Sequence, residues 1–214
     1  MLSYDRMHKT VIFDLDGTIA DSELVFFRIV NDLAPRFGYS PIVPDESSKL
    51  KKLHLRDFLL HRLGWRIIML PLILRAGRAR YHALASQVPV FPGTKEVFMT
   101  LRDHGVRIGM VSSSEVRTIR TILETNGLAV DFITHSNLFG KARALKRTLR
   151  EQSLVASDVV YVGDEVRDVE ACQEAGIPII AVTWGLNSKE ALEKAGAANT
   201  ADTQAALLEQ LLAH

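Results

Sequence analysis

The residues best suited to chemistry are acidic side chains at the ends of two predicted strands. Asp14 and Asp16 end an apolar run in VIFDLDGT, and residues two apart on a strand project from the same face. Asp164 and Asp168 lie four apart in VVYVGDEVRD, where another apolar run passes into a predicted helix, so they share one helix face. Converging carboxylates repel one another unless a cation lies between them. These four residues therefore predict a metal site, and oxygen ligands alone favour Mg²⁺.

Each acidic pair also has a purely structural explanation. Asp14 and Asp16 could belong to a turn whose acids cap a helix. Asp164 and Asp168 could simply be acids that the dipole stabilises at a helix N-terminus. The metal site requires that both strands end at the same edge of one sheet.

Two further motifs contain groups that suit a phosphate. Ser112 and its neighbour Ser113 lie in VSSS, where a strand end would offer hydroxyl and backbone N–H groups beside Asp14. Lys141, in LFGKARAL, begins a predicted helix, and its ammonium would offset the charge of a phosphate. Lys146 follows five residues later and could serve instead. A helix-capping serine and a solvated lysine are the ordinary alternatives.

The elements that would position these residues alternate between strands and helices. Predicted strands cover residues 8–15, 106–111, 131–135, 158–164 and 177–184, and predicted helices between the last four cover 114–125, 141–152 and 166–175. Apolar strands separated by helices predict an α/β fold, with a doubly wound, parallel, Rossmann-like sheet of five strands. Ligands of such sheets bind at the carboxyl ends of the strands.

The connection after the first strand is too long for a loop and has helical periodicity of its own. We expect helices over residues 22–38, 46–64 and 66–86, the last kinked at Pro71, and a return hinge over 88–93. The chain would then consist of an α/β core domain, residues 1–19 and 90–214, and a helical cap domain, residues 20–89.

The charges divide unevenly between these two predicted parts. Residues 21–90 contain 11 Lys or Arg and 6 Asp or Glu, whereas the rest of the chain contains 15 and 19. A cationic cap would attract small anions, unless its charges lie on solvated helix faces. The candidates for gripping an anionic leaving group are Arg62, Arg66, Arg75, Arg78 and His82.

Composition excludes several classes of protein. With 47% hydrophobic and 24% charged residues, the 214-residue chain is too apolar to be disordered. Its net charge of +1 gives no overall basic surface for nucleic acid. The single cysteine, Cys172, fits a reducing compartment. No apolar segment reaches the ~20 residues that cross a bilayer, and no secretion signal is visible. We expect a cytoplasmic protein with no nucleic-acid or membrane partner.

The order VIFDLDGT, VSSS, GK and VVYVGDEVRD resembles the four motifs of the haloacid dehalogenase-like (HAD) hydrolase superfamily. The resemblance covers the whole sheet domain, and the inserted segment resembles the superfamily's helical type-one cap. The stretch GDEVRDVEACQEAGIPIIAVTWGLNS is especially similar to phosphoglycolate phosphatases. The lysine motif departs from the pattern, because GKAR stands where many relatives have GKPxP.

The resemblance implies a mechanism. Asp14 would be the nucleophile that forms an aspartyl-phosphate, and Asp16 the general acid and base. The other matched positions would be Ser112 as a phosphate ligand, Lys141 as the charge-balancing lysine, Asp164 as a magnesium ligand, and Asp168 as a ligand or as a residue that orients one. The expected activity is a Mg²⁺-dependent phosphatase, a monomer or homodimer, that hydrolyses a small phosphorylated metabolite, either phosphoglycolate-like or a sugar phosphate.

Two other functions are compatible with the same motifs. A phosphomutase of the β-phosphoglucomutase type would pass the phosphoryl group to a sugar hydroxyl instead of water. A non-catalytic binding or membrane-surface module would use residues 66–75, eight apolar residues between two arginines, as an interfacial helix. Such a segment also suits packing inside a bundle or dimer.

Overall fold

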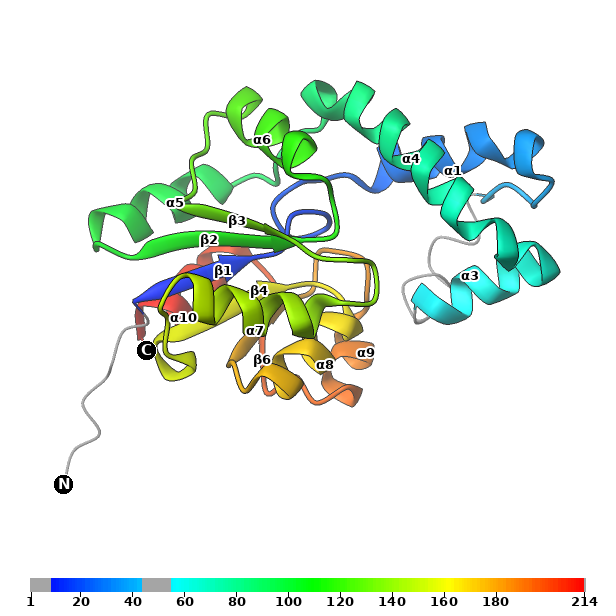
Figure 1. Ribbon diagram of the computed structural model, residues 1–214. Helices are drawn as coiled ribbons and strands as arrows, with labels where there is room; N and C mark the ends of the chain where they lie inside the picture. Colours follow the sequence, from blue (N-terminus) through cyan, green and yellow to red (C-terminus); the bar gives the residue numbers. More distant parts are fainter. Residues whose placement is uncertain (1–8, 44–54, 214) are drawn as a thin grey trace.

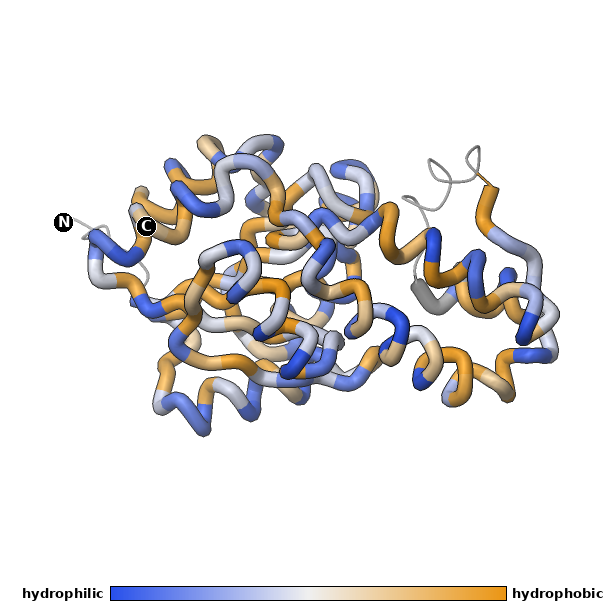
Figure 2. The backbone as a smooth tube through the Cα atoms, turned by 90° about the horizontal axis from the view of Figure 1, so that it is seen from above, coloured by the Kyte–Doolittle hydropathy of each residue, from blue (hydrophilic) through white to orange (hydrophobic). Residues whose placement is uncertain are grey.

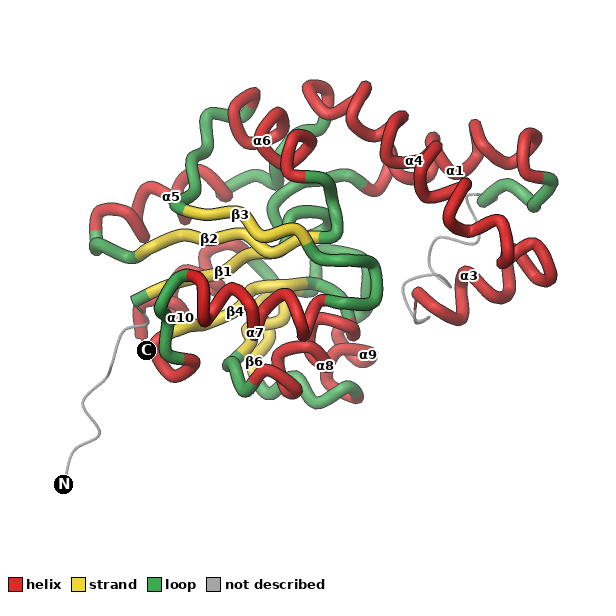
Figure 3. The backbone as a smooth tube through the Cα atoms, in the orientation of Figure 1, coloured by secondary structure: helices red, strands yellow, loops and turns green. Residues whose placement is uncertain are grey.

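The computed structural model describes residues 9–43 and 55–213, and in these residues six parallel strands form one sheet (Figures 1 and 3). Its order is β3-β2-β1-β4-β5-β6. The strands are β1 (Thr10–Phe13), β2 (Arg107–Ser112), β3 (Phe132–His135), β4 (Val159–Gly163), β5 (Ile179–Val182) and β6 (Asn199–Ala201). The predicted α/β, Rossmann-like fold is confirmed. The predicted number of strands is too small by one, because β6 is short and partly polar and forms no apolar run.

Helices cover both faces of the sheet. One face carries α5 (Thr94–Asp103), α6 (Val116–Thr125) and α10 (Gln204–Ala213), and the other carries α7 (Lys141–Glu151), α8 (Val166–Ala175) and α9 (Lys189–Lys194), with a short turn, η4 (Ala156–Asp158), before β4. Val11 and Phe13 of β1 pack with the first group, and Ile12 packs with the second. Burial on both faces explains why the central strands are continuous apolar runs.

A second group of helices lies between β1 and α5 in the sequence and beyond the carboxyl ends of the strands in space (Figure 1). We call its described residues, 23–43 and 55–87, the helical insertion. It comprises α1 (Glu23–Phe37), α3 (Leu55–Leu63), η2 (Gly64–Met69), α4 (Leu70–Leu84) and η3 (Ala85–Gln87). Ile29, Leu33 and Phe37 of α1 form a core of its own with Leu63 and with apolar residues of α4. Figure 2 shows hydrophobic residues along these helices as well as in the sheet. The part of the predicted helix over 46–54 lies outside the described residues.

The predicted helix over residues 66–86 is wrong in its first turns. A 3₁₀ segment, η2, precedes α4, and Pro71 lies in the first turn of α4 instead of kinking a longer helix. Proline is tolerated there because no carbonyl of the helix needs its missing N–H. Ile73 packs into the insertion's core, whereas Ile68 and Leu72 are exposed. No helix in the described part of the chain has the length and apolarity needed to cross a bilayer.

Two chain segments connect the insertion to the sheet, and they pair with each other. Ala20 and Val90 form an antiparallel bridge. The N–H of Asp21 donates to the carbonyl of Pro89 at 2.9 Å, and the N–H of Phe91 donates to the carbonyl of Ile19 at 3.0 Å. The segment predicted as the return hinge is therefore tied to the outgoing segment. The division into two domains remains a prediction.

Candidate active site

The ends of β1 and β4 bring three buried carboxylates together. The two strands are parallel neighbours, so Asp14 after β1 lies close to Asp164 after β4. Asp168 reaches the same point from the first turn of α8. Each residue contributes a carboxylate oxygen, and the three oxygens lie within 4.8 Å of one another. This arrangement matches the oxygen-only ligand set that Mg²⁺ prefers.

Lys141 binds two of these carboxylates directly. It is the first residue of α7, and its Nζ donates to Oδ2 of Asp14 at 2.5 Å and to Oδ1 of Asp168. Burial lowers the pKa of Lys141, but Asp14 and Asp168 raise it by more, so the pKa lies above its ordinary value and the ammonium stays charged. Lys146 is instead exposed and pairs with Glu174 at 2.9 Å. Of the two candidate lysines, the structure places Lys141 at the carboxylates.

The carboxylates carry more negative charge than Lys141 offsets. Burial raises the pKa of Asp164 well above its ordinary value of 3.8, and the charges of Glu165 and Asp168 raise it further. Burial also raises the pKa of Asp168, to about 6, although Lys141 acts in the opposite direction. A divalent cation would favour the ionised form of both groups, so the residues present fit a bound Mg²⁺.

The loops after β1 and β5 together fix the orientation of Asp164. The hydroxyl of Thr18 donates to its Oδ1 at 2.7 Å, and the N–H of Leu186 donates to its Oδ2 at 2.7 Å. Gly17 has φ +78°, and a Cβ at this position would lie 2.2 Å from Oδ2 of Asp164. Only glycine allows the loop to pass this close. Thr18 is a positioning residue that we did not predict, although it lies inside the DLDGT motif.

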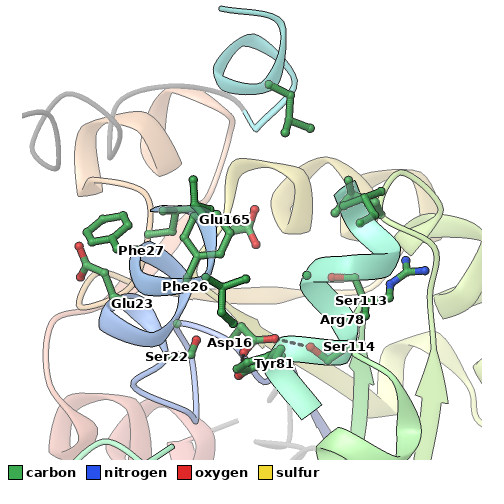
Figure 4. Close-up of a pocket in the computed structure, with 18 of the residues that line it drawn as sticks. Asp16, Ser22, Glu23, Phe26, Phe27, Arg78, Tyr81, Ser113, Ser114 and Glu165 are labelled. Atoms are coloured by element: carbon green, nitrogen blue, oxygen red, sulfur yellow. Dashed lines mark hydrogen bonds between the residues drawn. The ribbon is translucent and has the colours of Figure 1, made fainter. Parts of the chain in front are cut away.

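Asp16 bonds to a different set of partners. Tyr81 of α4 donates to its Oδ1, and the hydroxyl of Ser114 donates to its Oδ2 at 2.7 Å (Figure 4). Burial raises the pKa of Asp16, the hydrogen bonds from Tyr81 and Ser114 offset part of the rise, and Asp14 adds to it. The Asp16 carboxyl therefore lies between the sheet edge and the helical insertion. It is outside the group of three carboxylates, and its predicted role as a metal ligand remains a prediction.

The three serines after β2 differ in their environments. Ser112 is buried, and its hydroxyl accepts the N–H of Ser114 at 3.1 Å. Ser113 lines the cavity described below. Ser114, which bonds to Asp16, and Tyr81 are functional candidates that we did not predict. Ser114 is the third serine of VSSS, in which we predicted Ser112 and Ser113, and no sequence signal distinguishes Tyr81 from the other aromatic residues of the insertion.

A cavity of about 300 Å³ separates the sheet edge from the helical insertion. Its charged lining residues are Asp16, Glu23, Glu115, Asp164 and Glu165 against Arg62, Arg78 and Arg167. Arg66, Arg75 and His82 do not line it. Arg66 instead lies over the ring of Trp65, and Nδ1 of His82 lies 3.4 Å from the hydroxyl of Thr118. Of the five side chains expected to grip an anionic leaving group, two therefore line the cavity, Arg62 and Arg78.

Comparison with known proteins gives the family. Residues 11–182 match the haloacid dehalogenase-like hydrolases. The chain belongs to this family. It is 31% identical over 187 residues to a phosphoglycolate phosphatase of Synechococcus elongatus, covering 86% of this chain and 88% of the relative. It is 27% identical over 210 residues to a phosphoglycolate phosphatase of Xylella fastidiosa, covering 88% and 86%.

Several solved structures have the same fold. A predicted phosphatase from Clostridium acetobutylicum superposes with a TM-score of 0.84 at 25% identity, covering 96% of this chain and 99% of that one. CbbY from Rhodobacter sphaeroides, solved in complex with phosphate, gives a TM-score of 0.73 at 21% identity, covering 93% and 96%. The resemblance inferred from the four motifs is confirmed. The family and its relatives indicate that this HAD hydrolase is a phosphatase.

Proposed function

We propose that the protein is a Mg²⁺-dependent phosphatase that hydrolyses a small phosphomonoester through an aspartyl-phosphate on Asp14. The main support is the buried group in which Lys141 bonds to both Asp14 and Asp168 while Asp164 completes a set of three carboxylates. Asp16 lies beside this group and lines the cavity, where it would face the leaving group.

In the first half of the reaction, a carboxylate oxygen of Asp14 attacks the phosphorus in line. A new Asp14–phosphorus bond forms as the bond between phosphorus and the ester oxygen breaks. Asp16 donates its proton to that oxygen, so the alcohol leaves in neutral form. The hydrogen bonds from Tyr81 and Ser114 hold the Asp16 carboxyl at the cavity wall for this transfer.

In the second half, Asp16 acts as the base. It removes a proton from a water molecule, whose oxygen attacks the phosphorus and displaces the Asp14 carboxylate. Inorganic phosphate is released, and both aspartates return to their starting protonation states. A mutase would differ only at this step, since a sugar hydroxyl would replace water.

Charge repulsion is the main barrier to this chemistry, because an anionic carboxylate must approach an anionic phosphate. Lys141 offsets part of that repulsion from its position on Asp14. Asp14, Asp164 and Asp168 would hold Mg²⁺, which supplies further positive charge to the phosphate oxygens when bound. Ser112 and Ser113, at the end of β2, would bind phosphate oxygens through their hydroxyl and N–H groups.

The relatives also bear on substrate and setting. Those with 31% and 27% identity are named for phosphoglycolate, which supports a small phosphorylated metabolite as the substrate of this chain. Cys172 is free and buried, which agrees with a reducing compartment, and we propose the cytoplasm. A monomeric or homodimeric state without nucleic-acid partners remains a prediction.

The test is phosphate release from p-nitrophenyl phosphate by the wild-type protein and by Asp14→Asn, each with Mg²⁺ and with EDTA. We expect turnover only in the wild type with Mg²⁺. A folded Asp14→Asn variant, checked by its circular dichroism spectrum, should lose at least about 10³-fold in kcat. Activity that survives either EDTA or this substitution would contradict the proposal.

A further inference from the structure

We propose that the leaving group of the substrate is uncharged and largely apolar, and that it binds in the part of the cavity between α1 and α4. The inference rests on the proposed phosphatase function and names the class of its substrate. That class is the phosphate monoesters of alkyl or aromatic alcohols, instead of short anionic esters such as phosphoglycolate.

The cavity extends from the Asp16 carboxyl into a groove whose walls are hydrocarbon. Phe26, Phe27 and Val30 of α1 line one wall, and Leu70, Ile73 and Leu74 of α4 line the other. Tyr81 lines the end of the groove near Asp16, so the groove is continuous with the site of proton transfer. An alcohol released from Asp16 would therefore have its carbon atoms among these side chains.

Three of the lining side chains are not part of the insertion's buried core. Within the described residues, Phe26, Phe27 and Leu74 lie outside the buried core that joins α1 to α4. Phe26 is 42% exposed although it borders the catalytic edge. Figure 4 shows Phe26 and Phe27 on one side of the cavity, with Asp16 and Tyr81 below them. Their uncovered apolar surface would be removed from water by an apolar leaving group.

The charges around the cavity disfavour an anionic leaving group. Five carboxylates and three arginines line the cavity, and two of the carboxylates, on Glu115 and Glu165, pair with Arg117 and Arg167. The lining still has an excess of negative charge, which would repel a carboxylate on the substrate. An uncharged leaving group avoids that repulsion.

Two of the three arginines that line the cavity already bond to other groups of the protein. Arg167 pairs with Glu165 at 2.5 Å and donates to the carbonyl of Leu138 at 2.9 Å. Arg62 donates to the carbonyls of Ser40 and Pro41 at 3.0 and 2.8 Å.

The remaining cavity arginine is Arg78. It lies three residues before Tyr81 on α4, hence at the end of the groove nearest the phosphate site. The groove beyond Arg78, between α1 and α4, is lined by apolar side chains.

The test is a series of n-alkyl phosphates from ethyl to hexyl, compared with 2-phosphoglycolate in the presence of Mg²⁺. These alcohols have similar acidity, so kcat/KM along the series reports binding of the chain and not the chemical step. We expect kcat/KM to rise about threefold with each methylene until the groove is filled. Hexyl phosphate should exceed 2-phosphoglycolate by at least about tenfold.

A matched pair of variants locates the effect. Leu74→Gln places a polar group in the groove, and Leu72→Gln makes the same change on α4 at an exposed position outside the cavity. Leu74→Gln should reduce the rise of kcat/KM with alkyl chain length by at least about half. Leu72→Gln should leave that rise at its wild-type value. Equal effects of the two substitutions would overturn the placement in the groove.

The outcomes separate the inference from the function on which it rests. Flat kcat/KM along the series, with 2-phosphoglycolate preferred, overturns the apolar leaving group while the phosphatase proposal stands. Failure to hydrolyse any ester, including p-nitrophenyl phosphate, overturns both. The substrate series uses the wild-type protein, so this part of the test does not depend on the folding of a variant.

Discussion

The two walls of the cavity differ in the polarity and the burial of their side chains. On the sheet side, Asp14, Lys141 and Asp168 are almost completely buried, and hydrogen bonds to one another hold them in place. On the insertion side, Phe26 and Leu74 are apolar and keep part of their surface exposed. In the proposed function, the ends of the parallel strands supply the chemistry, and the helical insertion selects the group that is attached to the phosphate.

The two walls are connected by few polar contacts. Tyr81 of α4 donates to Asp16 of the loop after β1, and this bond joins the insertion to the proposed general acid. Further attachments are the pairing between the two connecting segments at Ala20 and Val90, and the contact of His82 with Thr118 of α6. Substitutions on the sheet side should therefore affect every substrate, and those on the insertion side should discriminate among substrates.

The largest effect on kcat and on stability is expected for a substitution of Lys141, on the sheet side of the cavity. Lys141→Met leaves Asp14 and Asp168 buried without their counter-charge, which should cost about 3–5 kcal/mol in the free energy of unfolding. It should also lower kcat by at least about 10³-fold for every ester. Urea denaturation and phosphate release would measure the two effects.

Lys146→Met is the matched control, because Lys146 lies on the same helix in an exposed pair with Glu174. Lys146→Met should change neither the free energy of unfolding nor kcat appreciably. If Lys146→Met impaired catalysis more than Lys141→Met, the assignment of the motif lysine would be wrong.

A smaller effect on kcat is expected when the hydrogen bond between Tyr81 and Asp16 is removed. Tyr81→Phe removes the hydroxyl that donates to Asp16 and keeps the aromatic ring. We expect kcat to fall about tenfold for an alkyl phosphate, whose alkoxide must be protonated on leaving. The fall should be much smaller for p-nitrophenyl phosphate, since nitrophenolate leaves without a proton. Equal losses for both esters would show that Tyr81 does not act through Asp16.

The smallest effect, on stability alone, is expected at the end of the sheet that is remote from the candidate active site. Asp131, just before β3, accepts from Arg102 at 2.8 Å and from the N–H of Ile108 at 2.7 Å. Burial raises the pKa of Asp131, but these hydrogen bonds outweigh it, so the pKa lies below 3.8. Its stabilising contribution is therefore present above pH 3.8 and is lost as the pH falls through the lowered pKa.

Asp131→Asn should destabilise the protein by about 1 kcal/mol at pH 7 and by progressively less toward pH 3, with unchanged kcat. Thermal unfolding at several pH values checks the trend. A stability difference that grew on acidification would contradict the assigned direction.

The sheet and its catalytic edge could be predicted because both depend on local patterns. Buried parallel strands are continuous apolar runs, and the residues that follow them meet at one edge. This rule is sufficient to place Asp14, Asp164 and Lys141 at the same edge of the sheet. It missed β6, whose Asn199 and Thr200 break the apolar pattern.

The insertion wall could not be predicted to the same degree, because it depends on how helices pack. Nothing in the sequence spacing relates Tyr81 to Asp16, which lies 65 residues away, or indicates that Ser114 holds the other oxygen. Counting charges is also misleading, since Arg66 and Arg75 contribute to the positive total of the segment without lining the cavity. Net charge reports composition, and packing decides where each charge points.

The central claim is that Asp14 carries the phosphoryl group during turnover. The most direct measurement is to quench the wild-type protein with acid while it hydrolyses p-nitrophenyl phosphate, and to locate any added phosphoryl group by peptide mass spectrometry. The account predicts the label on Asp14 in the wild type and none in Asp14→Asn. A label on Ser112 or Ser114 instead, or steady turnover with no labelled peptide even when Asp16→Asn slows the second step, would contradict it.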